Sequence, residues 1–496
     1  MERIWVDLIL EHGLVLTMDS QDRMIENGAV AILGDSIIAV GPQEEIVEKY
    51  QARKTISAER KVIMPGLVDT YGHAGHGMIK GIHHPDFGWP SSQLYFHATD
   101  ETWWYAEGRL SALERLKFGV TTGYTVIGAT PPRMDDPIYA ERQAQAVDEM
   151  GTRAVIGVGP PDPHVSHLPE PWSATQWQGD KARIIPFTFE DALVNSETVL
   201  REWHHHSNER IQVSLHYPYL FGRQAAHPRI PFEYHDGLVP EMIQRSSQIR
   251  ELADRYQALI HSHIFAGSVA YGLEKFGREM TENLLRAPVA FAHANGLLPQ
   301  EIELLGEMKT GICVVPYTHE NLYYGVCPVI DLLKAGANVS IATDGTAPYC
   351  SYDLFKDISR AIWAQWDVHK DQKVLPPGKA LRMVTIDAAK VLGMDHLIGS
   401  LEVGKRADLI LIDFNQPHLT PAVLIPRLLT HYVTGKDVDT VLVDGKILME
   451  NRKVKTVNEQ DVLDQAREAA HKSFERIDLN PYLAMGHQFW QGERYA

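Results

Sequence analysis

The central part of the chain alternates between short apolar runs and longer stretches with helical spacing. A run of four or five apolar residues bounded by polar or turn residues is typical of a buried strand. Stretches with helical spacing, such as 104–118 and 240–257, lie between these runs and predict helices. The strand candidates are residues 62–64, 119–122, 154–158, 211–215, 258–260, 289–292, 311–315 and 338–342. Eight strands alternating with helices favour a (β/α)8 barrel, a TIM-like fold whose chemistry lies at the carboxyl ends of the strands.

Both ends of the chain show a different pattern, in which short apolar runs are separated by turn residues. Near the start, residues 28–32 and 37–40 flank Gly34-Asp35, which is a hairpin signal. Near the other end, residues 399–413 and 438–446 each place a turn before a strand. Two unrelated β segments would fit this pattern. We favour a single small β-sandwich built from both chain ends.

These patterns together predict an α/β protein in which a barrel is accompanied by a small β-sandwich domain. A helix is expected after the last strand, and its aromatic tail could cap the fold or a neighbouring subunit. The predicted division places the two parts of the β-sandwich at 1–61 and 391–455, the barrel at 62–390, and the C-terminal helix and tail at 456–496.

Composition narrows the partners that the chain can have. The formal net charge of −17 argues against a nucleic-acid partner. No stretch approaches the ~20 apolar residues of a membrane span, and Asp7 and Glu11 interrupt any apolar core of a signal peptide. The three cysteines have neither zinc-finger nor disulfide spacing. We therefore expect a cytoplasmic protein that acts on a small molecule, with no nucleic-acid or membrane partner.

Potential metal ligands follow the predicted strands of the barrel. His73 comes after the first strand, His261 and His263 after the fifth, His293 after the sixth and Asp344 after the eighth. The carboxyl ends of barrel strands meet at one mouth, so these side chains should converge. Any one histidine would more often be a hydrogen-bonded pocket residue. Together they predict one divalent transition metal, zinc foremost, with iron, manganese or cobalt as alternatives.

The stretch 65–73, which reads Pro-Gly-Leu-Val-Asp-Thr-Tyr-Gly-His, resembles the opening metal motif of the amidohydrolase superfamily. That motif reads Pro-Gly-x-x-Asp-x-His-x-His. Residues 292–294, 343–345 and 404–409 extend the resemblance over nearly the whole chain, to the branch that contains cytosine deaminase-like enzymes and triazine hydrolase-like chlorohydrolases. The metal ligands that the resemblance implies are His73, His263, His293 and Asp344, with His261 as the alternative to His263.

Three positions depart from the family pattern. Tyr71 stands where the first histidine of the motif is expected, and we expect it to donate a hydrogen bond or line the pocket; His76 is a less favoured replacement ligand. His216 follows the fourth strand, where binuclear members carry a bridging group, and no lysine lies nearby. A mononuclear site is therefore favoured. Ala266 lies three residues after His263, where deaminases of this branch carry a glutamate.

The predicted catalytic residues are Asp344 as the base, with His293 and His319. Asp344, His216 or His319 could protonate a leaving amine. Aromatic-rich loops after the strands favour a planar, weakly polar ligand, although ordinary loop packing would give the same composition. The predicted substrate-binding residues are Tyr71, His76, Trp89, His216, His261 and Tyr324.

The function that the resemblance implies first is metal-dependent hydrolysis of a C–N bond in an amide, urea or carbamate-like group. The substrate would be a small aromatic or cyclic molecule. One alternative is an aminohydrolase or dechlorinase of an N-heterocycle, which Ala266 disfavours. A second alternative is a catalytically silent scaffold of the same fold. Members of this superfamily often form homo-oligomers, and we expect the same here.

Overall fold

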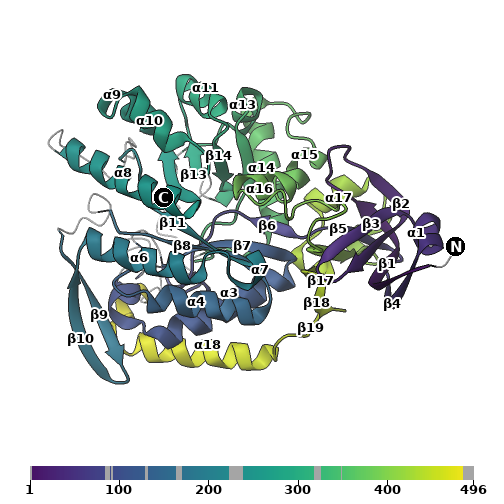
Figure 1. Ribbon diagram of the computed structural model, residues 1–496, viewed down its shortest axis with the longest axis horizontal. Helices are drawn as coiled ribbons and strands as arrows, with labels where there is room; N and C mark the ends of the chain where they lie inside the picture. The colour runs from purple at the N-terminus through teal and green to yellow at the C-terminus, as the bar shows by residue number, and fades with distance from the viewer. Residues whose placement is uncertain are drawn as a thin grey trace, which may run out of the picture.

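The structure is a computed structural model that describes residues 3–83, 90, 93–128, 132–162, 170–222, 238–317, 325–347 and 349–483. Within these residues, one parallel sheet curls into a barrel and a second sheet lies beside it (Figure 1). The fold class expected from the sequence is confirmed. None of the helices in the described ranges is long and apolar enough to cross a membrane.

The barrel sheet has eight parallel strands whose spatial order follows the sequence from β6 to β15. The first and last strands meet where Gly72 and Asp344 form a parallel bridge, so the barrel is nearly closed. Its strands are β6 (Leu67–Asp69), β7 (Val120–Val126), β8 (Arg153–Val158), β11 (Ile211–His216), β12 (Ile260–Phe265), β13 (Val289–Asn295), β14 (Gly311–Val314) and β15 (Asn338–Ile341).

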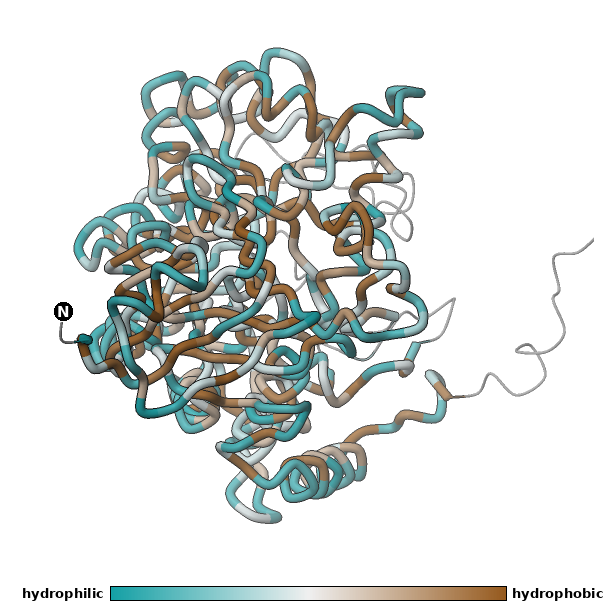
Figure 2. The backbone as a smooth tube through the Cα atoms, turned by 90° about the vertical axis from the view of Figure 1, so that its right-hand side faces the viewer, coloured by the Kyte–Doolittle hydropathy of each residue, from teal (hydrophilic) through white to brown (hydrophobic). Residues whose placement is uncertain are grey.

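Helices cover the outside of the barrel, and the hydrophobic segments of the backbone gather beneath them (Figures 1 and 2). Parallel strands enclosed in this way are buried on both faces, which explains why they read as continuous apolar runs. These helices are α3 (Glu101–Lys117), α4 (Ile138–Met150), α6 (Phe189–Trp203), α7 (His206–Glu209), α8 (Val239–Tyr256), α9 (Ser268–Lys275), α10 (Arg278–Leu285), α11 (Pro299–Glu307), α13 (Val329–Ala335), α14 (Leu354–His369), α15 (Pro377–Arg382) and α16 (Ile386–Val391).

The strand predictions need two corrections. Residues 62–64 belong to β5 (Lys61–Pro65), which pairs with strands of the second sheet, and the first barrel strand is the short β6. Hydrophobic pattern shows that a segment is a buried strand but not which sheet it joins. In addition, β12 and β13 continue through His263 and His293, so these histidines lie within strands. Apolar runs mark only the part of a strand that packs in the core.

The second sheet combines strands from both ends of the chain, as expected. Its strand order is β19-β18-β17-β16-β5-β1-β2-β3, and β4 pairs with β1. Strand β5 joins the two ends because it pairs with β1 on one side and β16 on the other. The strands are β1 (Ile4–Leu16), β2 (Met24–Leu33), β3 (Ser36–Pro42), β4 (Tyr50–Ser57), β16 (Leu409–Asp413), β17 (Val438–Val443), β18 (Lys446–Glu450) and β19 (Lys453–Val454).

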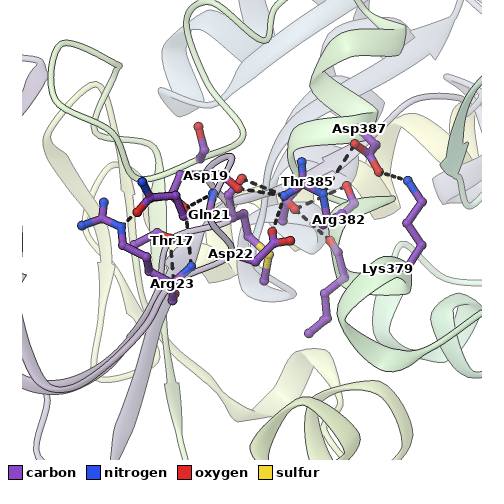
Figure 3. Close-up of polar contacts among 12 residues, drawn as sticks. Thr17, Asp19, Gln21, Asp22, Arg23, Lys379, Arg382, Thr385 and Asp387 are labelled. Carbon is purple, nitrogen blue, oxygen red and sulfur yellow. Dashed lines mark hydrogen bonds and ion pairs between the residues drawn. The ribbon is translucent and has the colours of Figure 1, made fainter.

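Polar contacts fix the second sheet to the barrel. The buried guanidinium of Arg153 on β8 donates to Asp408 at 2.8 Å and also reaches Asp444. Arg382 of α15 donates to the backbone oxygen of Asp19 at 2.9 Å and pairs with Asp22, both in the loop between β1 and β2 (Figure 3). Because these partners lie in different parts of the sequence, only the folded chain brings them together.

The remaining helices and strands lie outside the barrel and the core of the second sheet. A two-stranded antiparallel hairpin projects from the barrel, and the long C-terminal helix lies along α3 (Figure 1). These elements are α1 (Gln43–Lys49), β9 (Trp172–Gln178), β10 (Lys181–Phe187), α17 (Ile425–His431), α18 (Glu459–Phe474) and α19 (Asn480–Leu483). The predicted helix within 456–496 is therefore present, and the aromatic tail beyond Leu483 lies outside the described residues.

Candidate active site

The first part of the site follows directly from β6. Asp69 is fully buried at the end of this strand and accepts hydrogen bonds from the backbone nitrogen and the hydroxyl of Thr343, at 3.0 and 2.8 Å. Burial raises the pKa of Asp69, although the nearby Arg115 and the Thr343 hydrogen bonds oppose this shift. The carboxylate thus joins the ends of β6 and β15 and fixes the residue before Asp344.

Tyr71 lies between two histidines from distant parts of the chain. Its hydroxyl is 2.8 Å from Nε2 of His73 and 2.6 Å from Nε2 of His263. Nδ1 of each histidine lies 2.9 Å from a backbone oxygen, that of Gly128 for His73 and that of Pro218 for His263. Because a carbonyl only accepts, each Nδ1 carries a proton. The Nε2 atoms of both rings therefore face the same hydroxyl.

Asp344 completes this arrangement from the other side. Its Oδ1 lies 3.1 Å from Nε2 of His73 and accepts a hydrogen bond from the backbone nitrogen of Gly345 at 2.6 Å. Its own backbone nitrogen donates to the oxygen of Tyr71 at 2.9 Å. Burial alone would raise the pKa of Asp344, but His73 and His293 outweigh it and hold the pKa well below the ordinary value. This carboxylate is an anion at neutral pH.

His293 reaches the same region from β13. Its ring stacks on that of His263 with centroids 5.2 Å apart and on Phe265 at 5.3 Å. The backbone φ is +71° at His293 and +62° at Asp344. Side chains other than glycine rarely adopt this left-handed region, and such residues often lie at functional sites.

Three further histidines surround this group. His76 stacks on His73 at 4.7 Å, and a Cβ at position 345 would come 1.9 Å from its Nδ1, so only glycine fits beside it. His261 stacks on Tyr71 at 4.7 Å, and its Nε2 faces the thiol of Cys313 at 3.6 Å. Burial and neighbouring histidines lower the pKa of His261 to about 3, which leaves the ring neutral.

His216 is buried beside these rings, 5.5 Å from His261 by ring centroids. Neither of its ring nitrogens has a hydrogen-bond partner within the described part of the chain. Burial and three neighbouring histidines lower the pKa of His216 well below the ordinary value. A neutral imidazole is costly to bury without hydrogen bonds, so His216 is a candidate contact for a ligand at this end of the barrel.

The structure therefore brings most of the predicted site residues to one end of the barrel. Trp89, His319 and Tyr324 lie outside the described residues. The residues at the barrel end are Tyr71, His73, His76, His216, His261, His263, His293 and Asp344.

One group that supports these residues has no signal in the sequence. Arg115 on α3 donates to Asp69 and to the backbone oxygen of Tyr124, and its guanidinium lies 3.9 Å from the ring centroid of Tyr352. Tyr352 in turn donates to the backbone oxygen of His73 at 3.1 Å. In a sequence, an arginine within a predicted helix is expected at the surface, and only its burial in the fold reveals this contact.

The donor atoms are of the type that divalent metals prefer, namely imidazole nitrogen and carboxylate oxygen. However, across the residues that the structure describes, no three His, Cys, Asp or Glu side chains are already arranged around a common point for a metal. The Tyr71 hydroxyl lies between Nε2 of His73 and Nε2 of His263, which are two of the nitrogens that would face a metal. The chemistry of the site fits a cation, and its geometry is that of a hydrogen-bonded state.

Comparison with known proteins decides the family. Residues 62–448 match the model of the Amidohydrolase family. The chain belongs to the amidohydrolase family. This amidohydrolase is 29% identical over 473 residues to a 5-methylthioadenosine/S-adenosylhomocysteine deaminase of Syntrophobacter fumaroxidans, covering 93% of this chain and 97% of the relative. The resemblance seen in the sequence is confirmed.

Solved structures share the fold of this amidohydrolase. An adenosine deaminase from Xanthomonas campestris with bound zinc superimposes with a TM-score of 0.77 at 21% identity, covering 95% of this chain and 99% of the other. The atrazine chlorohydrolase TrzN from Arthrobacter aurescens, complexed with zinc, gives 0.74 at 19% identity, covering 93% and 100%. The amidohydrolase is thus a hydrolytic enzyme that acts on C–N bonds of small molecules, as expected from the sequence.

Proposed function

We propose that this amidohydrolase removes an exocyclic amine from a planar nitrogen heterocycle by hydrolysis, with one divalent metal held by His73, His263, His293 and Asp344. This is the aminohydrolase alternative of the sequence analysis. It is supported by the relative named as a deaminase, which covers nearly the whole chain. The structural observation that supports it most is that one Tyr71 hydroxyl lies between Nε2 of His73 and Nε2 of His263, with Asp344 beside His73.

That observation can be expressed as a count of protons. Nε2 of His73 and Nε2 of His263 face a single Tyr71 hydroxyl, and Nε2 of His73 also lies 3.1 Å from Oδ1 of Asp344. One hydroxyl donates only one proton. The hydroxyl can therefore donate to only one of the two nitrogens. A buried group of acceptors that lacks protons is stabilised by a cation, and this supports a metal there.

His263 is the better candidate than His261 for the ligand from β12. Its Nε2 points to the same hydroxyl as that of His73, whereas Nε2 of His261 faces a thiol. His293 is placed beside His263 by the stacking of their rings. The proposed set has three nitrogens and one oxygen, which suits zinc, iron, cobalt or manganese.

A metal in this position would lower the pKa of a bound water and polarise the bond under attack. The residues of the chain supply the remaining steps. Asp344, an anion at neutral pH, accepts the proton of the attacking water and passes it to the departing amine. The rings of Tyr219 and Phe265 lie 5.4 Å from His263 and 5.3 Å from His293, which favours a flat substrate beside these histidines.

A second candidate is hydrolysis of an amide, urea or carbamate-like group, and one residue favours it. Ala266 follows β12 at the position where related deaminases carry a glutamate, and its backbone nitrogen donates to Asn295 at 3.0 Å. A methyl side chain cannot transfer a proton to a ring nitrogen. Deamination here requires a different proton donor, whereas cleavage of an amide does not require a protonated ring.

Product analysis separates the two candidates. Zinc-reconstituted enzyme is incubated with adenine nucleosides and aminotriazines, and in parallel with aryl ureas, carbamates and amides. The proposal expects ammonia from the heterocycles, with no release by the metal-free enzyme. Release of an amine from the ureas or amides, with heterocycles unchanged, would instead establish the second candidate.

A further inference from the structure

The hydroxyl of Tyr71 contacts Nε2 of His73 and Nε2 of His263, which are the atoms that the proposed metal needs as ligands. Its distances of 2.8 Å to Nε2 of His73 and 2.6 Å to Nε2 of His263 are both within hydrogen-bonding range. A lone pair that accepts a hydrogen bond is not available to a cation at the same time. The hydrogen bond and the metal therefore compete for these nitrogens.

The ring of Tyr71 is held firmly in this position. It is buried, it stacks on His261 at 4.7 Å with 7° between the ring planes, and it meets His73 and His263 edge-on at 5.1 and 5.4 Å. Its backbone oxygen accepts a hydrogen bond from Asp344. Close packing opposes a swing of the ring, so the hydroxyl stays beside the two nitrogens.

We propose that Tyr71 weakens and thereby sets the affinity of this site for divalent metals, by competing through its hydroxyl for His73 and His263. The inference rests on the proposed metal site and adds a role for the residue that replaces the expected histidine. In the metal-free protein the hydroxyl satisfies one nitrogen. Metal binding must break that hydrogen bond, and removal of the hydroxyl removes this cost.

The test is the affinity of the metal-free, full-length protein for Zn²⁺, measured by competition with a chromophoric chelator at neutral pH. Tyr71→Phe keeps the stacked ring and deletes only the hydroxyl. The loss of one competing hydrogen bond predicts binding that is about fivefold to tenfold tighter than in the wild type. The rise in Tm on adding Zn²⁺ should also be larger in this variant.

The matched control is Tyr124→Phe. Tyr124 is also buried, with its ring 6.3 Å from that of Tyr71, but its hydroxyl accepts a hydrogen bond from Ser214 at 3.0 Å. Loss of this hydroxyl should leave the affinity for Zn²⁺ unchanged within about twofold, because it does not contact the proposed ligands.

Weaker binding in Tyr71→Phe would show that the hydroxyl oxygen is itself a ligand, and unchanged binding would show that it does not compete. Either result overturns the inference. His263→Ala separates this failure from failure of the proposed function. If that variant binds Zn²⁺ as tightly as the wild type, the metal site itself is wrongly assigned. If it loses Zn²⁺ while Tyr71→Phe does not gain affinity, only the role of Tyr71 is wrong.

Discussion

At the scale of single residues, the site depends on atoms whose hydrogen-bonding roles are fixed by the backbone. Gly128 and Pro218 accept from Nδ1 of His73 and His263, so both Nε2 atoms face inward. Asp344 is held by Gly345 and by the oxygen of Tyr71. Backbone contacts of this kind limit the rotation of these side chains, and such preorganisation favours electrostatic catalysis.

Replacement of the proposed base tests this view. Asp344→Asn keeps the shape of the side chain but removes its charge and its ability to accept a proton. We expect kcat to fall by about a thousandfold or more, since the general base and a ligand are lost together. Initial rates with the substrate found by product analysis measure the effect, and far-UV circular dichroism checks the fold. A rate equal to that of the wild type would remove Asp344 from the mechanism.

At the scale of secondary-structure elements, the C-terminal helix is tied to the barrel through one carboxylate. Asp100 caps the amino terminus of α3 by accepting from the backbone nitrogens of Thr102 and Trp103. It also pairs with Lys472, which lies in the last turn of α18, at 2.9 Å, and with Arg476, which follows that helix, at 3.1 Å. The same side chain thus caps α3 and holds α18 against it.

The variant Asp100→Asn should lower the free energy of unfolding by about 1–2 kcal/mol at pH 7, because an amide makes weaker contacts with the two cations. Burial raises the pKa of Asp100, but Thr102 and Lys472 outweigh it and lower the pKa to about 2. The folded pKa is below the unfolded value of 3.8, so this stabilisation is present above pH 3.8 and is lost as pH falls through 2.

Urea unfolding of the wild type and Asp100→Asn across that pH range measures this contribution. The difference between the two proteins should shrink as the pH falls below 3.8. Glu101→Gln is the matched control, since Glu101 is exposed and pairs with Arg142 on the surface. A difference that persists unchanged at low pH would contradict the assigned ion pairs.

At the scale of the whole molecule, the barrel and the second sheet are joined by a buried ion cluster. The guanidinium of Arg153 has no exposed surface and contacts Asp408 and Asp444, which belong to the C-terminal strands of the second sheet or their turns. A buried pair is expensive to break, because the remaining charges are left without a partner in a medium of low polarity.

Arg153→Met should therefore destabilise the protein by about 3–5 kcal/mol and weaken the coupling between the barrel and the second sheet. Differential scanning calorimetry should then show a second transition or a broader one. Arg201→Met, at an exposed pair with Glu202, should change the Tm little. A single sharp transition at the wild-type Tm in Arg153→Met would show that the cluster does not couple them.

The sequence by itself determined three properties of the protein. These are the alternation of strands and helices, the presence of one sheet built from both chain ends, and membership of the amidohydrolase family. These properties depend on the local hydrophobic pattern and on short motifs, such as residues 65–73, which can be recognised from the sequence alone. The choice of sheet for β5, the full extent of β12 and β13, and the support of the site by Arg115 were decided by the tertiary structure. Each of these features depends on which parts of the folded chain pack against each other.

The candidate site shows the same division. The motif placed an unusual tyrosine at position 71, and hydrogen bonding was one of its two expected roles. The sequence could not show that its hydroxyl bridges His73 and His263, which lie 190 positions apart. Hydrogen bonds extend only about 3 Å, so their partners are fixed by the packing of the barrel and not by distance along the chain.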